Sequence, residues 1–135
     1  MNAADLPHLV IGACMNVHRA LGPGLTQDAY EECVAIELRE MEFDFKRQVP
    51  LEFSYHGRRV QTQTRLDFVV GGSLLLLVRA QGEITRLQQQ ELESKVRLGH
   101  FQTGLIVNFN VGTLRKGIHQ ITVKRRAEGG VSQKG

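Results

Sequence analysis

The segment from Ser73 to Ala80 constrains the fold of this chain more than any other. Its residues 74–78 are uninterrupted apolar side chains. A strand that is apolar on both faces has to be covered on both faces, which happens when helices pack on either side of a sheet. The preceding segment Arg58–Val70 has the pattern of a long strand, and Gly71-Gly72 between the two is a two-residue hairpin signal. The sequence therefore predicts two antiparallel central strands.

Three segments have helical spacing, and they surround this hairpin. A first helix ends at Gly22-Pro23-Gly24, a second follows Thr26, and a third covers Ile84–Gly99. The apolar stripe of the second helix consists of Tyr30, Cys33, Val34, Leu38 and Met41. Its glutamates are expected on the solvent side, and they are Glu31, Glu32, Glu37 and Glu40.

Further strands complete the sheet. Phe43–Gln48 and Leu51–Tyr55 read as strand segments interrupted at Val49-Pro50, since proline favours an edge or a bend. Thr103–Phe109 is apolar and follows a helix, so it is expected to run parallel to its neighbour, and Gly117–Lys124 reads as a last edge strand. We therefore predict an α/β fold with a mixed central β-sheet flanked by helices, in one domain over residues 1–126, with a disordered tail at 127–135.

Composition sets mild limits on function. The net charge of +3 and the pI of about 9.1 permit contact with DNA or RNA without requiring it. The basic run Lys124-Arg125-Arg126 is either a solvated strand end or a phosphate contact. The two cysteines, with no secretory signal pattern, favour free thiols in a cytoplasmic protein, and no apolar run is long enough to span a membrane. A homo-oligomer is compatible with all of this.

One carboxylate stands out in the predicted hairpin. Strand alternation places Leu66, Phe68 and Val70 on one side and Asp67 on the other. On the next strand, Arg79 shares a side with Leu75 and Leu77. An Asp67–Arg79 ion pair across the two strands is one interpretation, because a buried carboxylate needs a partner. A metal-binding carboxylate is the other.

Four ordered segments carry a family resemblance, over about Leu9 to Ile121. They are Val17–Cys33 with its Gly-Pro-Gly turn, Arg47–Leu51, Arg65–Val70 and Gly104–Asn110. Together they resemble the GxxExxY family, a branch of the PD-(D/E)XK nuclease superfamily, which implies a restriction-endonuclease-like core. The resemblance implies a site made of a helix glutamate, a strand aspartate, a Glu-x-Lys pair, and a glutamine one helical turn before a tyrosine. Such a site holds Mg²⁺, which activates water for phosphodiester hydrolysis.

Most of these positions are altered in this chain. The strand aspartate is kept as Asp67, but the helix glutamate is Gln27 and the Glu-x-Lys pair lies over Leu77 and Arg79. Leucine cannot bind a metal, and arginine keeps the charge without being able to act as a base. The helix glutamine and tyrosine fall on Glu91 and Lys95.

The resemblance also implies substrate-binding roles for His18, Gln27 and Tyr30, of which His18 and Tyr30 match the family. Glu91 and Lys95 are one helical turn apart, so they either form a surface ion pair or have taken over the lost carboxylate and lysine.

Three functions remain open on these grounds. The first is a catalytically impaired nuclease-like protein that binds nucleic acid or a protein partner through the former cleft. The second is an active nuclease with Asp67 and Glu91 as metal ligands, Lys95 and Arg79 beside them, and Mg²⁺ as cofactor. The third is a structural or oligomeric protein in which Leu77 fills the former site.

Overall fold

A computed structural model describes residues 5–123 of the chain. In chain order the elements are α1 (Leu6–Leu21), α2 (Gln27–Glu40), β1 (Phe45–Tyr55), β2 (Arg58–Val70), β3 (Leu74–Arg79), α3 (Arg86–Leu98), β4 (Thr103–Asn108), the short 3₁₀ helix η2 (Leu114–Gly117) and β5 (Ile118–Thr122). The predicted tail at 127–135 and the basic run 124–126 lie outside the described residues.

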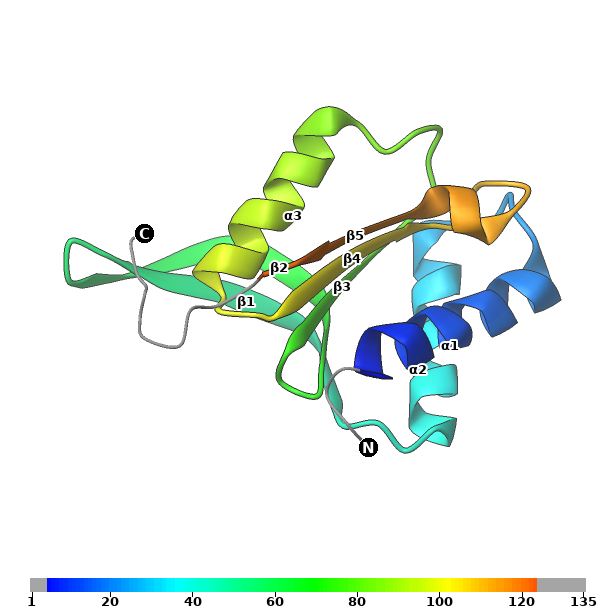
Figure 1. The fold of residues 1–135 in the computed structure, drawn as a ribbon, viewed down its shortest axis with the longest axis horizontal. Helices are drawn as coiled ribbons and strands as arrows, with labels where there is room; N and C mark the ends of the chain where they lie inside the picture. The colour runs from blue at the N-terminus through cyan, green and yellow to red at the C-terminus, as the bar shows by residue number, and fades with distance from the viewer. Residues whose placement is uncertain (1–4, 124–135) are drawn as a thin grey trace.

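The strands form one five-stranded sheet in the order β1-β2-β3-β4-β5. All neighbours are antiparallel except β3 and β4, which are parallel and joined through α3. Helices α1 and α2 pack on one face and α3 on the other (Figure 1). The predicted α/β fold with a mixed, helix-flanked sheet is therefore confirmed. No helix within residues 5–123 is long and apolar enough to cross a membrane.

The apolar run at 74–78 separates two cores, as its pattern predicts. Leu74, Leu76 and Val78 pack with α1 and α2, whereas Leu75 and Leu77 pack with α3. All five side chains are almost fully buried. The driving force is the removal of apolar surface on both sides of the strand from water.

The hairpin between β2 and β3 has three loop residues instead of the expected two, because Val70 pairs with Leu74. Gly71 and Gly72 have φ angles of 60° and 71°. Side chains other than glycine rarely adopt this left-handed region, which explains the two glycines. Ser73 then closes the turn by donating its N–H to the Val70 carbonyl at 3.2 Å.

Two expectations about the strands are wrong. Strand β1 is not interrupted at Val49-Pro50 but continues with a register shift between Pro50 and Glu52, although it does lie at the edge of the sheet, as the proline predicts. Leu66 does not share a face with Phe68, since Leu66 packs on the α3 side and Phe68 on the α1–α2 side. Alternation breaks at Asp67, where β2 stops pairing with β3 and Gln48 of the neighbouring strand has a φ of 53°.

Helix α3 lies close to β4 because residue 104 has no side chain. A Cβ atom on Gly104 would come within 2.4 Å of Val96 and 2.9 Å of Leu92. The start of the helix is fixed by a capping box, in which the Thr85 hydroxyl and the Gln88 side chain bond each other's backbone N–H groups. Gln88 also exchanges hydrogen bonds with the Gln81 side chain.

The loop between β3 and α3 is bound to the end of β4. The Asn108 side chain accepts the N–H of Gln81 and donates to the carbonyls of Gln81 and Gly82. The end of β3 and the start of α3 are thereby held in a fixed position beside the site described next.

Candidate functional site

Asp67 lies where β2 and β3 separate. Their pairing ends at Phe68 and Leu76, and two residues further along β3 the N–H of Val78 donates to the Asp67 carboxylate at 2.9 Å. The residue is 7% exposed. A buried carboxylate that terminates strand pairing in this way keeps its oxygens at the gap between the strands.

Arg79 provides the countercharge for this carboxylate. Its Nη1 lies 2.8 Å from the Asp67 Oδ2 and donates to the Val78 carbonyl at 2.7 Å. The predicted cross-strand ion pair is confirmed. Within residues 5–123, Nε and Nη2 of Arg79 form no hydrogen bond, so they can bind an anion at the surface of the gap.

A second carboxylate lies nearby on α2. Glu31 was expected to face solvent, but it is 7% exposed and accepts hydrogen bonds from Gln27 at 2.9 Å and from Gln48 at 3.3 Å. Arg47 of β1 lies 3.5 Å from Glu31 and 3.0 Å from Glu32. The expectation was wrong because Arg47 and Gln48, near the start of β1, provide partners that helical periodicity alone does not reveal.

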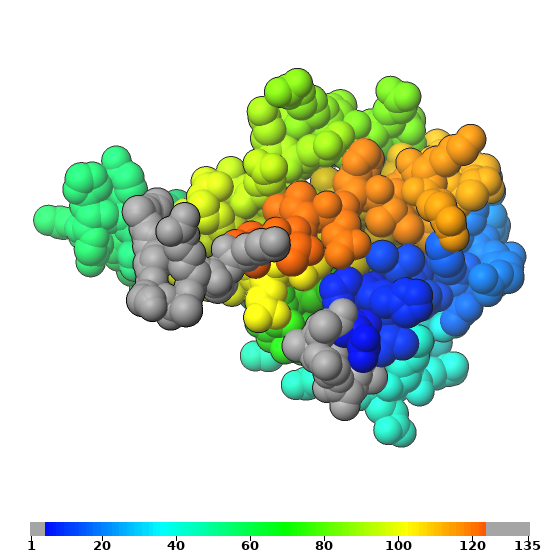
Figure 2. All heavy atoms as spheres, in the orientation of Figure 1, coloured from blue at the N-terminus to red at the C-terminus, as the bar shows by residue number. Residues whose placement is uncertain are grey.

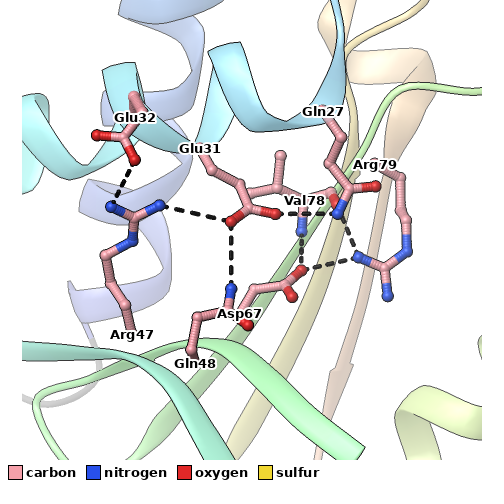
Figure 3. A network of polar contacts seen from close by, with 8 residues as sticks. All are labelled: Gln27, Glu31, Glu32, Arg47, Gln48, Asp67, Val78 and Arg79. Carbon is pink, nitrogen blue, oxygen red and sulfur yellow. Dashed lines mark hydrogen bonds and ion pairs between the residues drawn. The ribbon is translucent and has the colours of Figure 1, made fainter.

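Gln48 lies beside both carboxylates and is bonded to one of them. By register it lies opposite Asp67, since Arg47 pairs with Phe68 and Val49 with Leu66. Its side chain bonds Glu31, so the contacts of Glu31 and those of Asp67 form neighbouring parts of one polar cluster (Figure 3). We call Gln27, Glu31, Gln48, Asp67 and Arg79 the polar cluster.

Leu77 points away from this cluster. It is 2% exposed and packs with Leu92 and Val96 of α3. The position at which the resemblance implies a metal-binding glutamate is therefore part of the hydrophobic core.

Glu91 and Lys95 lie on the outer part of α3. Both border an open groove of about 380 Å³ that is completed by Leu51 of β1 and by Leu87, Gln90, Ser94 and Leu98 of α3. Glu91 is exposed, and no ion pair joins it to Lys95 within the described part of the chain. No contact joins either residue to Asp67 there, so their role as replacements stays a prediction.

Tyr30 and His18 use their polar atoms within the fold. The Tyr30 hydroxyl donates to the Gly22 carbonyl and accepts the Leu25 N–H, and its ring stacks on Phe109 at 4.6 Å. His18 bonds the Val111 carbonyl through Nε2 at 2.8 Å. These contacts favour structural roles, in which both residues fix the turn after α1 and the segment after β4.

The fit of a divalent metal can be tested on these residues. Mg²⁺ requires a near-octahedral set of oxygen ligands. Within residues 5–123 no group of three or more acidic, histidine or cysteine side chains is arranged to hold a metal ion. Asp67 is already bonded by Val78 and Arg79, and Leu77 offers no oxygen. The residues present do not fit the metal site that the resemblance implies.

Residues 4–121 match the sequence model of a family described as the PD-(D/E)XK nuclease superfamily. The chain belongs to this superfamily. No curated protein and no solved structure matches it. The match covers all the elements described above except the last residue of β5, so the superfamily assignment applies to the whole fold.

Sequence reasoning identified Asp67, Arg79 and Gln27 but missed Glu31, Gln48 and Arg47. One signal for Glu31 was available, because it lies one helical turn after Gln27 and so shares its face of α2. Arg47 and Gln48 fall within a segment that resembled the family, although no role was assigned to them. Their contribution depends on β1 lying beside α2, which only the assembled sheet reveals.

Proposed function

We propose that this member of the PD-(D/E)XK superfamily binds nucleic acid at the polar cluster without hydrolysing it. The observation that carries the proposal is the ion pair between Arg79 and Asp67. In a metal-dependent nuclease the cation beside such an aspartate is the metal, which neutralises the phosphate and activates water. Here a guanidinium supplies the positive charge, and it can neither activate a water by coordination, as a metal does, nor take a proton from it.

Arg79 is suited to bind a phosphate group. Its side chain is 23% exposed, and two of its three nitrogen atoms are free of protein partners within residues 5–123. A guanidinium forms paired hydrogen bonds with phosphate oxygens. The Gln27 side chain, half-buried on α2, offers a second polar group beside it (Figure 3).

A protein partner is a second candidate, favoured by the α3 groove. Leu87 is 62% exposed at the groove, and Leu77 fills the neighbouring core. Exposed apolar side chains beside a groove are typical of contact surfaces. Sedimentation of the purified chain would reveal self-association, and the Leu87→Ser variant would abolish it if this groove were responsible.

The test of the first proposal measures binding and cleavage together. Labelled single- and double-stranded DNA and RNA are incubated with the full chain, with EDTA, Mg²⁺ or Mn²⁺. We expect binding that is independent of metal, that weakens as salt rises, and that leaves the nucleic acid intact. Arg79→Met should weaken binding about tenfold or more, whereas Arg97→Met, which removes an exposed arginine from α3, should change it less than threefold.

Two results would contradict the proposal. Absence of any binding at low salt would exclude a nucleic-acid ligand. Cleavage that requires Mg²⁺ and disappears in Asp67→Ala would instead support an active nuclease, and Glu91→Gln and Lys95→Met would then show whether α3 contributes to the site.

A further inference from the structure

The ribbon formed by β1 and β2 extends beyond the rest of the sheet. Strand β3 pairs with β2 only from Phe68 to Val70, whereas β1 and β2 remain paired as far as Tyr55 and Arg58. Residues 51–65, which we call the arm, extend from the body (Figure 1), and their green tip protrudes at one end of the space-filling view (Figure 2). Eight extended residues span about 25 Å, so the arm is long relative to the domain.

The two faces of the arm differ. On one face Leu51 and Phe53 continue the core beneath α3, and Val60 lies opposite Phe53. The other face consists of long polar side chains on alternate residues of β2, which are Arg59, Gln61, Gln63 and Arg65, all exposed. The polar face therefore points toward the side of the sheet on which α1 and α2 pack.

The arm carries an excess of positive charge. Residues 51–65 contain three basic side chains and one acidic side chain, a net charge of +2, against +3 for the whole chain. The single acid, Glu52, forms an ion pair with Arg59 at 2.6 Å. Arg65 forms no ion pair within residues 5–123, and neither does Arg58 near the tip.

A solvated strand face is the ordinary explanation for such a pattern, but it does not explain the length of the ribbon. Two strands without a third are marginally stable in water. A ribbon of this kind fits the major groove of B-form DNA, which is about 12 Å wide. Arginine and glutamine are also the side chains that pair with guanine and adenine edges there. The deep, narrow major groove of an RNA duplex does not admit the same contacts.

We propose that the polar face of the arm, formed by Arg59, Gln61, Gln63 and Arg65, is a contact surface for double-stranded DNA. This inference rests on the proposed nucleic-acid function and adds a second surface outside the polar cluster. The arm lies in the major groove, while the polar cluster lies against the backbone of the same duplex.

The experiment compares matched charge removals in the full chain. The Arg59→Gln/Arg65→Gln variant removes two charges from the arm, and the Arg86→Gln/Arg97→Gln variant removes two exposed charges from α3. Fluorescence anisotropy measures binding to a labelled 25-base-pair DNA duplex, to an RNA duplex and to single-stranded DNA of equal length. Thermal unfolding by circular dichroism checks that each variant is folded.

We expect the arm variant to bind duplex DNA at least tenfold more weakly, with a salt slope reduced by about two, since each phosphate contact contributes about one. The affinity of the α3 variant for duplex DNA should differ from that of the wild type by less than threefold. The Gln61→Ala/Gln63→Ala variant should reduce the preference for duplex DNA over duplex RNA with little change in salt slope, because it removes base contacts and no charge.

Different results separate the arm from the polar cluster. If the wild type binds DNA and the arm variant binds equally well, the arm inference is wrong and the proposed function stands. If the arm variant loses binding to all three nucleic acids equally, duplex recognition by the arm is wrong. If the wild type sediments as a dimer and the arm variant as a monomer, the arm is a surface for a second copy, which also overturns the inference.

Discussion

The guanidinium of Arg79 and the carboxylate of Asp67 lie 2.8 Å apart at the point where β2 and β3 separate. The carboxylate also accepts the N–H of Val78, which lies two residues beyond Leu76, the last residue of β3 paired with β2. This ion pair therefore completes the junction between two central strands in addition to setting the charge of the candidate site.

Removing the arginine should destabilise the fold. Arg79→Met leaves a carboxylate whose side chain is 10% exposed without a countercharge. Loss of one partner of a buried pair costs about 3–5 kcal/mol, and because the Arg79 side chain is 23% exposed we expect about 2–4 kcal/mol here. Urea unfolding measures the loss. In the Asp67→Asn/Arg79→Met double variant most of the stability should return, because no unpaired charge remains. Equal stability of wild type and single variant would show that the pair contributes nothing.

The two adjacent glutamates of α2 offer a matched comparison. Glu31 is buried and accepts two side-chain amides, whereas the Glu32 side chain is 67% exposed. Glu31→Gln should cost about 1–3 kcal/mol in unfolding free energy, since the neutral amide is a weaker acceptor and loses Arg47. Glu32→Gln should stay within about 0.5 kcal/mol. A larger effect at Glu32 would mean that Arg47 depends mainly on the outer glutamate.

A substitution at Gly104 tests how closely α3 packs against β4. The Gly104→Ala methyl would meet Val96 at 2.4 Å, so we expect a loss of about 1–3 kcal/mol from overpacking. Gly82→Ala is the control, because an added methyl there meets nothing within 4 Å. Chemical denaturation compares the two. Combining Gly104→Ala with Val96→Ala should recover part of the loss if steric crowding is its cause.

The burial of the Cys14 thiol predicts how the stability of the fold changes at alkaline pH. Burial, with a smaller contribution from Glu37, raises the pKa of its thiol from 9.0 to about 12. Above pH 9 the unfolded chain releases this proton and the folded chain keeps it, so stability present below pH 9 is lost as the pH rises. The slope for one group is about 1.4 kcal/mol per pH unit. Between pH 8 and 10.5 the free energy of unfolding of Cys14→Ala should therefore fall by about 2 kcal/mol less than that of the wild type.

The control for this prediction is the other cysteine. Cys33 is partly exposed, and Cys33→Ala should keep the alkaline loss of the wild type. A thiol reagent at pH 8 should likewise label Cys33 in the folded protein and leave Cys14 unreacted until unfolding. Rapid labelling of Cys14 would contradict its burial.

Local pattern was sufficient to predict most of the fold. The apolar run at 74–78, the paired glycines and the helical stripes depend on neighbours in sequence, and they led to the correct layers. The break in alternation at Asp67 was not predictable in the same way. It arises because β1 and β2 continue where β3 diverges, which is a property of three strands together.

The candidate site was predicted only in part for a similar reason. Asp67 and Arg79 are close in the hairpin, so their pairing followed from two adjacent strands. Glu31 acquires its partners from Arg47 and Gln48, which are 16 and 17 residues away along the chain. Helical periodicity assigns a glutamate to solvent unless a distant polar partner is known, and here the partner is on another element.

The attachments of the two sides of the sheet differ in chemistry. Helix α2 is joined to β1 by the charges of Arg47, Glu31 and Glu32, whereas the start of α3 is held by the neutral amides of Gln81, Gln88 and Asn108. Dissolved ions screen the first kind of contact, most strongly at the exposed Glu32, and leave the second kind largely unaffected. In concentrated salt the α2 side should exchange its amide hydrogens sooner while α3 stays protected, so ionic strength would loosen one layer of this small domain and leave the other in place.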